Sequence, residues 1–236
     1  FLIEAFDLLD RHVARLRVQE SGHQEDVFDH TRRIEILSNC IYGVDKDEQA
    51  VAVARLNLCL KALHMRDKLP MLENVRCGDS LISGTSQELQ AAFGPDWQAK
   101  KPFNWEMEFP EAMKDGGFDL IVGNPPYVRQ ETLGQEFKDF VQQRYATYAG
   151  TADLYTYFLE RALSLLKPGG LLGYIVSNKW MRSNYGKALR EFLSTQTSLV
   201  EIVDFGELSV FQTAATFPAI IIVRKQPMPT QRFLYA

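Results

Sequence analysis

The order of strand-like and helix-like patterns along the chain constrains the fold more than any other feature of the sequence. Short apolar runs typical of β-strands cover residues 40–44, 75–78, 118–123, 171–177, 199–205 and 217–223. Amphipathic helical patterns cover residues 1–16, 46–65, 153–166 and 185–196. Strands that alternate with helices predict an α/β fold with a mostly parallel, doubly wound sheet. No helical pattern separates the last two runs, which predicts that residues 217–223 form one antiparallel strand near an edge.

The composition is that of one large globular domain. The 236 residues include 46% hydrophobic and 24% charged side chains, so we expect residues 1–225 to form a single domain and residues 226–236 to form a tail. The net charge of −4 provides no overall attraction to nucleic acid, and contact with it would need a local basic face. Three widely spaced cysteines and four histidines without ligand spacing predict neither a disulfide framework nor a metal site. No apolar run reaches the roughly 20 residues that span a bilayer, so we expect a cytoplasmic protein without membrane contact.

Acidic residues follow two of the predicted strands. In open α/β sheets, ligands bind beyond the carboxyl ends of the strands. Asp45 follows the first run, where a carboxylate can accept hydrogen bonds from both hydroxyls of a ribose; it can equally serve as the N-cap of the next helix. Asp79 follows the second run and can accept a hydrogen bond from an adenine amino group or close a turn. Both are candidate ligand-binding residues.

The run at residues 118–123 ends in Asn124, Pro125, Pro126 and Tyr127. Two prolines remove two backbone N–H groups and fix φ, so the loop is stiff and the Pro125 carbonyl stays available as an acceptor. The Asn124 side chain adds a second acceptor, and Tyr127 adds an aromatic face. This combination fits a planar ring that carries an NH₂ group. The alternative is a structural turn with a surface tyrosine.

The sequence GNPPY after FDLIV resembles the catalytic motif of S-adenosylmethionine-dependent methyltransferases that act on amino groups. The order of motifs over nearly the whole chain is similar to that of gamma-type adenine-specific DNA methyltransferases. Residues 103–128, 153–170 and 176–193 are more specifically similar to the modification domain of type IIG restriction-modification enzymes. The NPPY tetrapeptide also occurs in methyltransferases that act on a glutamine of release factors and on guanine in ribosomal RNA.

The resemblance implies a class I, Rossmann-like methyltransferase fold with S-adenosylmethionine as cofactor. It assigns Asp45 to the cofactor ribose, and Asp79 and Phe158 to the cofactor adenine. Its target-base residues are Asn124, Pro125 and Tyr127, together with Phe211 or Phe217 as aromatic side chains that stack on the base; core packing is the alternative for both phenylalanines. An aromatic residue often follows the position of Asp79 in the family, whereas Ser80 stands there in this sequence.

The resemblance also implies that a segment precedes Phe1. The family places a strand and a Gly-rich loop, which holds the methionine part of the cofactor, directly before a helix like FLIEAF, and this sequence opens with that helix. We therefore expect residues 1–225 to be a methyltransferase domain that lacks its first strand and Gly-rich loop. Residues 226–236 are expected to lead toward a target-recognition domain of the same polypeptide.

The expected activity is methyl transfer from S-adenosylmethionine to the 6-amino group of adenine in DNA, within a restriction-modification system. The partner would be double-stranded DNA with a flipped adenine. One alternative is a methyltransferase for RNA or a protein glutamine, and a second is a binding fragment without catalysis. The basic side chains of Lys179, Arg182, Lys187 and Arg190 form either a phosphate-binding face or a solvated surface.

Overall fold

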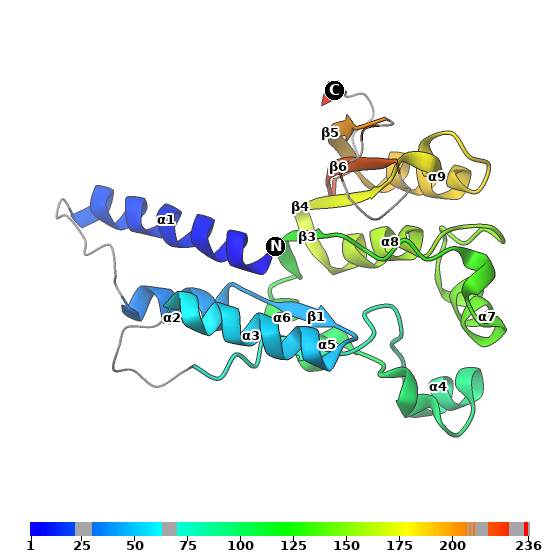
Figure 1. The fold of residues 1–236 in the computed structure, drawn as a ribbon, viewed down its shortest axis with the longest axis horizontal. Coiled ribbons are helices and arrows are strands. Elements are labelled where there is room, and N and C mark those ends of the chain that lie inside the picture. Colours follow the sequence, from blue (N-terminus) through cyan, green and yellow to red (C-terminus); the bar gives the residue numbers. More distant parts are fainter. Residues whose placement is uncertain are drawn as a thin grey trace. The chain divides into compact units, whose positions relative to one another are not determined.

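The computed structural model describes residues 1–21, 30–62, 70–206, 208, 210, 217–226 and 234–235. The chain divides into two compact units (Figure 1). Unit 1 consists of Phe1–Ser80 and Lys101–Phe103, and unit 2 consists of Leu81–Lys100 and Asn104–Ala236. The described strands accordingly form two separate sheets, one in each unit.

In unit 1, helices pack on a two-stranded parallel sheet (blue to cyan in Figure 1). The described elements are α1 (Leu2–Ser21), α2 (His30–Asn39), β1 (Gly43–Asp45), α3 (Glu48–Ala62) and β2 (Val75–Cys77). Gly43 pairs with Val75 and Asp45 with Cys77, so the carboxyl ends of the two strands lie at the same edge. Apolar side chains from all three helices and from β2, including Phe6, Leu37 and Leu58, form the core.

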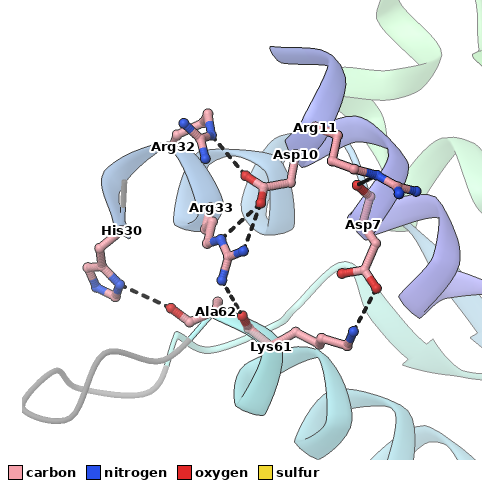
Figure 2. A network of polar contacts seen from close by, with 8 residues as sticks. All are labelled: Asp7, Asp10, Arg11, His30, Arg32, Arg33, Lys61 and Ala62. Atoms are coloured by element: carbon pink, nitrogen blue, oxygen red, sulfur yellow. Dashed lines mark hydrogen bonds and ion pairs between the residues drawn. The ribbon is translucent and has the colours of Figure 1, made fainter. Parts of the chain in front are cut away.

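A polar network joins the three helices of unit 1 (Figure 2). The carboxylate of Asp10 in α1 lies between Arg32 and Arg33 of α2, with oxygen–nitrogen distances of 2.8 and 2.9 Å. Arg33 also donates a hydrogen bond to the carbonyl of Lys61 in α3 at 2.9 Å. At the more exposed side of the network, the Lys61 ammonium pairs with Asp7 at 2.6 Å. The network therefore ties α1 to both α2 and α3.

Unit 2 contains a five-stranded mixed sheet with the strand order β3-β4-β6-β5-β7. Its strands are β3 (Phe118–Gly123), β4 (Leu166–Ser177), β5 (Ser198–Asp204), β6 (Pro218–Arg224) and β7 (Leu234–Tyr235). Its described helices are α4 (Ser86–Phe93), α5 (Trp105–Glu108), α6 (Pro110–Lys114), α7 (Gln135–Arg144), α8 (Tyr155–Leu165) and α9 (Gly186–Gln196), with short 3₁₀ turns at Trp97–Lys100, Gln130–Thr132 and Asn178–Met181. The main core packs α8 and α9 on the sheet through Leu159, Leu172 and Leu189.

The sheet confirms the predicted strand directions. β3 runs parallel to β4, and β6 runs antiparallel to both β4 and β5. The prediction of an α/β fold with a mostly parallel sheet and one antiparallel strand is thus confirmed, but the predicted place of that strand near an edge was wrong, because β6 lies between β4 and β5 in the middle of the described strand order. The predictions of a strand before Phe1 and of a tail that leads to a further domain stay predictions.

Several local expectations were wrong. The sequence pattern did not predict α2 or α7. β4 begins at Leu166 instead of residue 171, because Leu166 pairs with Phe118 of β3. In the apolar strand β3, Leu120 is 55% exposed and Val122 39% exposed. Among the described residues β3 pairs with β4 alone, so it is an edge strand.

Gly117, at the turn into β3, gives a direct test of this packing. Its φ is +113°, and a Cβ atom there would lie 2.2 Å from the carbonyl oxygen of Leu165. The Gly117→Ala substitution should therefore destabilise the protein by at least about 1–3 kcal/mol, measured by urea denaturation. Gly150→Ala is the control, because no atom lies within 4 Å of the added Cβ and its φ is not in the left-handed region. Equal denaturation midpoints for the two variants would contradict the packing described.

Candidate functional site

Four chain segments meet at one edge of the sheet of unit 2. β3 and β4 are parallel neighbours, so their carboxyl ends, at Gly123 and Ser177, share that edge. Because β6 is antiparallel, its first residue, Pro218, pairs with Ser177. β5 ends at the same edge with Asp204, which pairs with Ala219. The loop that follows β3 therefore lies at the edge where the segments after β4 and β5 and before β6 also lie.

The loop after β3 consists of residues 124–127 and is called the NPPY loop here. Asn124 is exposed, so its side-chain oxygen and nitrogen are accessible, while Pro125 is buried and anchors the loop. Tyr127 is half-buried, and its hydroxyl lies in the interior without a hydrogen-bond partner. Burial raises the pKa of this hydroxyl. Tyr127 is therefore partly enclosed by the protein, with its hydroxyl end inside.

Of the other predicted aromatic residues in unit 2, two can be placed. Phe158 in α8 is half-buried and packs against both hydrophobic clusters of the unit. Phe217 precedes β6 and is 43% exposed, which is not the environment of a core residue. Its carbonyl accepts a hydrogen bond from the Asn178 N–H at 2.7 Å, which fixes Phe217 at the edge that carries the NPPY loop. Phe211 lies outside the described residues.

The two predicted acidic ligands lie at the carboxyl edge of the sheet of unit 1. Asp45 ends β1 and is exposed; its Oδ1 accepts the Asp47 N–H at 2.8 Å. Asp47, and not Asp45, caps the N-terminus of α3. The Oδ1 of Asp47 accepts the Gln49 N–H at 2.8 Å, which is the alternative role considered for Asp45. Asp79 follows β2, and its side chain is 12% exposed. Its Oδ2 pairs with the Lys46 ammonium at 2.9 Å.

The sequence analysis missed the segment that covers this edge, residues 101–103. The carbonyl of Lys101 accepts the Asp79 N–H at 2.6 Å, and the Lys101 ammonium pairs with Glu48 at 3.0 Å, which raises the pKa of that ammonium. The Phe103 ring packs so closely on Gly78 that a Cβ there would lie 2.6 Å from its Cδ2. The glycine before Asp79 was the only signal in the sequence for this close approach.

The predicted basic face is divided by the structure. Arg190 is half-buried and donates hydrogen bonds to the carbonyls of Trp180 and Ser183, so it has a structural role. Lys187 is exposed and lies 3.8 Å from Glu191. Lys179 and Arg182 are also exposed, and both follow β4 at the edge of the NPPY loop. These two remain the candidates for phosphate contact.

The described part of the chain offers two further observations. It contains no group of three or more His, Cys, Asp or Glu side chains that could hold a metal ion. It also contains no helix with the length and apolar character required to cross a membrane.

Comparison with known proteins gives consistent matches. The family described as Eco57I restriction-modification methylase matches residues 39–211. Two curated relatives are the type II restriction enzyme and methyltransferase RM.Eco57I of Escherichia coli and the type II methyltransferase M.XhoI of Xanthomonas vasicola. RM.Eco57I is 30% identical over 96% of the length of this chain, and M.XhoI is 30% identical over 94% of it. The chain covers 23% of RM.Eco57I and 40% of M.XhoI, and thus less than half of either relative.

Among solved structures, a nuclease-deletion mutant of the type ISP restriction-modification enzyme LlaGI, in complex with a DNA substrate mimic, has a similar fold. The similarity has a TM-score of 0.63 at 14% identity and covers 96% of this chain and 20% of that chain.

Proposed function

Because the chain belongs to the Eco57I restriction-modification methylase family, we propose that it carries the catalytic site of an enzyme that methylates the 6-amino group of adenine in DNA. Its fold is that of the class I methyltransferases, and its cofactor is S-adenosylmethionine. The observation that carries the proposal is the NPPY loop, with Asn124 exposed and Pro125 buried directly after an edge strand.

The adenine amino nitrogen is a poor nucleophile because its lone pair is delocalised into the ring. The Asn124 side-chain oxygen and the Pro125 carbonyl each accept one N–H of the amino group. These two hydrogen bonds draw the nitrogen toward tetrahedral geometry and direct its lone pair outward. S-adenosylmethionine supplies the electrophilic methyl group. The rigid loop prepares both acceptors before the substrate arrives, so they need no reorganisation during the reaction.

The carboxylates of unit 1 have the chemistry that the adenosine part of the cofactor requires. Asp45 is exposed at the end of β1 and accepts hydrogen bonds from the ribose hydroxyls. Asp79 accepts one from the cofactor adenine, and its Oδ2 also lies 2.9 Å from the Lys46 ammonium.

The target base must leave the duplex before its amino group can be reached. Flipping costs a few kcal/mol, and stacking on an aromatic side chain returns about 1–3 kcal/mol per base. Tyr127 provides one face for the flipped adenine, and Phe217 or Phe211 provides a second. The remainder of the polypeptide recognises the DNA sequence, with residues 1–225 as the methyltransferase domain and residues 226–236 leading toward the recognition domain.

A methyltransferase for RNA or a protein glutamine remains the alternative, because it would need the same acceptors for an amino or amide nitrogen. The decisive experiment uses the full-length protein and labelled S-adenosylmethionine with duplex DNA, the corresponding RNA and a release-factor protein. Label in N6-methyladenine from duplex DNA is the expected result. Label on cytosine, or on RNA or protein only, would refute the proposal. Binding of the cofactor without transfer to any of the three would favour a binding protein without catalysis.

The Asp45→Ala substitution should weaken S-adenosylmethionine binding by about 1.5–3 kcal/mol, because the ribose hydroxyls lose a charged acceptor. Calorimetric titration of the full-length protein measures the change, and DNA affinity should stay the same. Asp47→Ala is the matched control: it removes the cap of α3 and should lower stability by about 1 kcal/mol without a similar loss of cofactor affinity. Unchanged affinity in Asp45→Ala would assign Asp45 to the turn alone.

A further inference from the structure

Three side chains of unit 2 form a short chain of hydrogen bonds. The hydroxyls of Tyr155 and Tyr185 lie 2.9 Å apart, and the Tyr185 hydroxyl lies 3.2 Å from Oδ2 of Asp153. A charged carboxylate can only accept, so Tyr185 donates its proton to Asp153. The Tyr155 hydroxyl must then donate to Tyr185. Every proton in this chain has a defined direction that ends at the Asp153 carboxylate.

Asp153 depends on these partners for its charge. Tyr155 is fully buried, while Asp153 and Tyr185 are half-buried. Burial raises the pKa of the Asp153 carboxyl, and the hydrogen bond from Tyr185 opposes that increase. Lys179 and Arg129 also favour the charged form, whereas Glu131 disfavours it. A carboxylate in such a setting is costly unless it is hydrogen-bonded, so its bond to Tyr185 is a strong constraint on both residues.

The residue next to Asp153 holds the segment that follows the NPPY loop. The Leu154 N–H donates a hydrogen bond to the carbonyl of Val128 at 2.9 Å, and Val128 directly follows Tyr127. The Asp153 carbonyl in turn accepts the N–H and the hydroxyl of Thr156, at 3.1 and 2.9 Å, which forms the first turn of α8. The direction of the Leu154 N–H is therefore fixed by the conformation of Asp153.

The other end of the chain lies in the segment after β4. Tyr185 stands between the 3₁₀ turn at Asn178–Met181 and α9. Asp153 and Tyr185 thus join the segments that follow two neighbouring parallel strands, β3 and β4, at the edge of the sheet where the NPPY loop lies. No side chain of the NPPY loop takes part in the hydrogen bonds described. The loop is therefore held by residues that lie outside it.

We propose that Asp153 and Tyr185 are positioning residues for the proposed methyl transfer, which hold the NPPY loop, and with it Asn124 and Pro125, in register with the segment after β4. The inference rests on the proposed function. It assigns to these two residues no contact with the cofactor or the target base. They act through the Leu154–Val128 hydrogen bond, so their loss should slow transfer without weakening cofactor binding.

The test uses the full-length protein with Asp153→Ala, which removes the acceptor of the Tyr185 hydroxyl, Tyr185→Phe and the double variant. Single-turnover methyl transfer to duplex DNA should be about tenfold slower in each single variant. Because both substitutions remove the same bond, the double variant should be slower than the single variants by no more than about twofold. Cofactor affinity, measured by calorimetry, should be unchanged. Tyr157→Phe, in α8, is the matched control, because like Tyr185→Phe it removes a tyrosine hydroxyl, but one without a hydrogen-bond partner, and the rate should stay at the wild-type value.

Hydrogen exchange distinguishes failure of this inference from failure of the proposed function. In Tyr185→Phe and Asp153→Ala, the Leu154 amide and residues 124–132 should exchange faster than in the wild type, whereas Tyr157→Phe should leave both unchanged. This result does not depend on the methyl acceptor. Three results would each overturn the positioning role. They are unchanged exchange at Leu154, transfer rates of the variants within about twofold of the wild type, and a loss of transfer rate in Tyr157→Phe equal to that in the test variants. A wild-type protein that methylates no adenine would refute the proposed function, while the exchange data would still decide whether the pair holds the loop.

Discussion

Replacement of Asn124 by alanine should lower the single-turnover rate of methyl transfer by about 10²- to 10³-fold. In the proposed mechanism, the substitution removes one of the two acceptors for the adenine amino group and leaves Pro125 and the Tyr127 ring in place. The lost hydrogen bond matters most when the nitrogen becomes tetrahedral, so the loss of about 3–4 kcal/mol falls mainly on the transition state. The affinities for S-adenosylmethionine and for DNA should stay near the wild-type values.

The measurement is transfer of a labelled methyl group to duplex DNA by the full-length protein, with the product nucleosides identified. Asn124→Asp supplies an informative comparison, because a carboxylate keeps the acceptor oxygens; it should retain more activity than Asn124→Ala. Asn39→Ala, at an exposed position in unit 1, should have no effect. A rate for Asn124→Ala within about threefold of the wild type would show that the NPPY loop does not hold a target amino group.

The positions of the candidate site residues follow from local sequence information. The NPPY loop was predictable because an apolar run that ends in two prolines cannot continue as a paired strand, whatever surrounds it. Asp45 was predictable for a similar reason, since the end of β1 is marked by the change from an apolar run to charged residues. The antiparallel direction of β6 followed from the absence of a helical pattern between it and β5.

Contacts between distant segments were not predictable in this way. The residues that cover the edge next to Asp79, Lys101–Phe103, return to unit 1 after an excursion that belongs to unit 2. No periodicity indicates where such a segment comes back. The hydrogen bonds that connect Tyr155 to Asp153 were not predictable either, because Tyr185, which lies between them, belongs to a separate part of the chain. Only the three-dimensional structure joins these residues.

The missed helix α2 has a more specific explanation. Its inward-facing positions are Arg32, Ile36 and Leu37, so a charged residue occupies a place where helical periodicity requires an apolar one. The side chain of Arg32 is nearly inaccessible, with a relative exposure of 2%, and Asp10 of α1 neutralises it. A buried charge pair between two helices is invisible to a hydrophobic pattern. It also makes unit 1 sensitive to the loss of either partner.

The Asp10→Ala substitution should therefore destabilise unit 1 by about 3–5 kcal/mol. Asp10 accepts from both Arg32 and Arg33 (Figure 2), so its removal takes one carboxylate away from the nearly inaccessible Arg32 guanidinium. The energetic cost comes mainly from the desolvation of the buried charge, which the Asp10 carboxylate no longer offsets, and only secondarily from the lost attraction. Hydrogen exchange of the full-length protein, read on peptides from α1 and α2, measures the free energy of local opening.

Asp7→Ala is the matched control in the same helix and the same network. The Asp7–Lys61 pair is short, at 2.6 Å, but its side chains are 29% and 44% exposed, so solvent screens the interaction and its loss should cost no more than about 1 kcal/mol. The two aspartates lie one turn apart on α1, and both substitutions leave a good helix former, so helix propensity does not separate them. The difference between the variants therefore isolates burial of the partner charge. Similar opening free energies for Asp10→Ala and Asp7→Ala would show that the pair of Asp10 and Arg32 is not the element that holds α2 against α1.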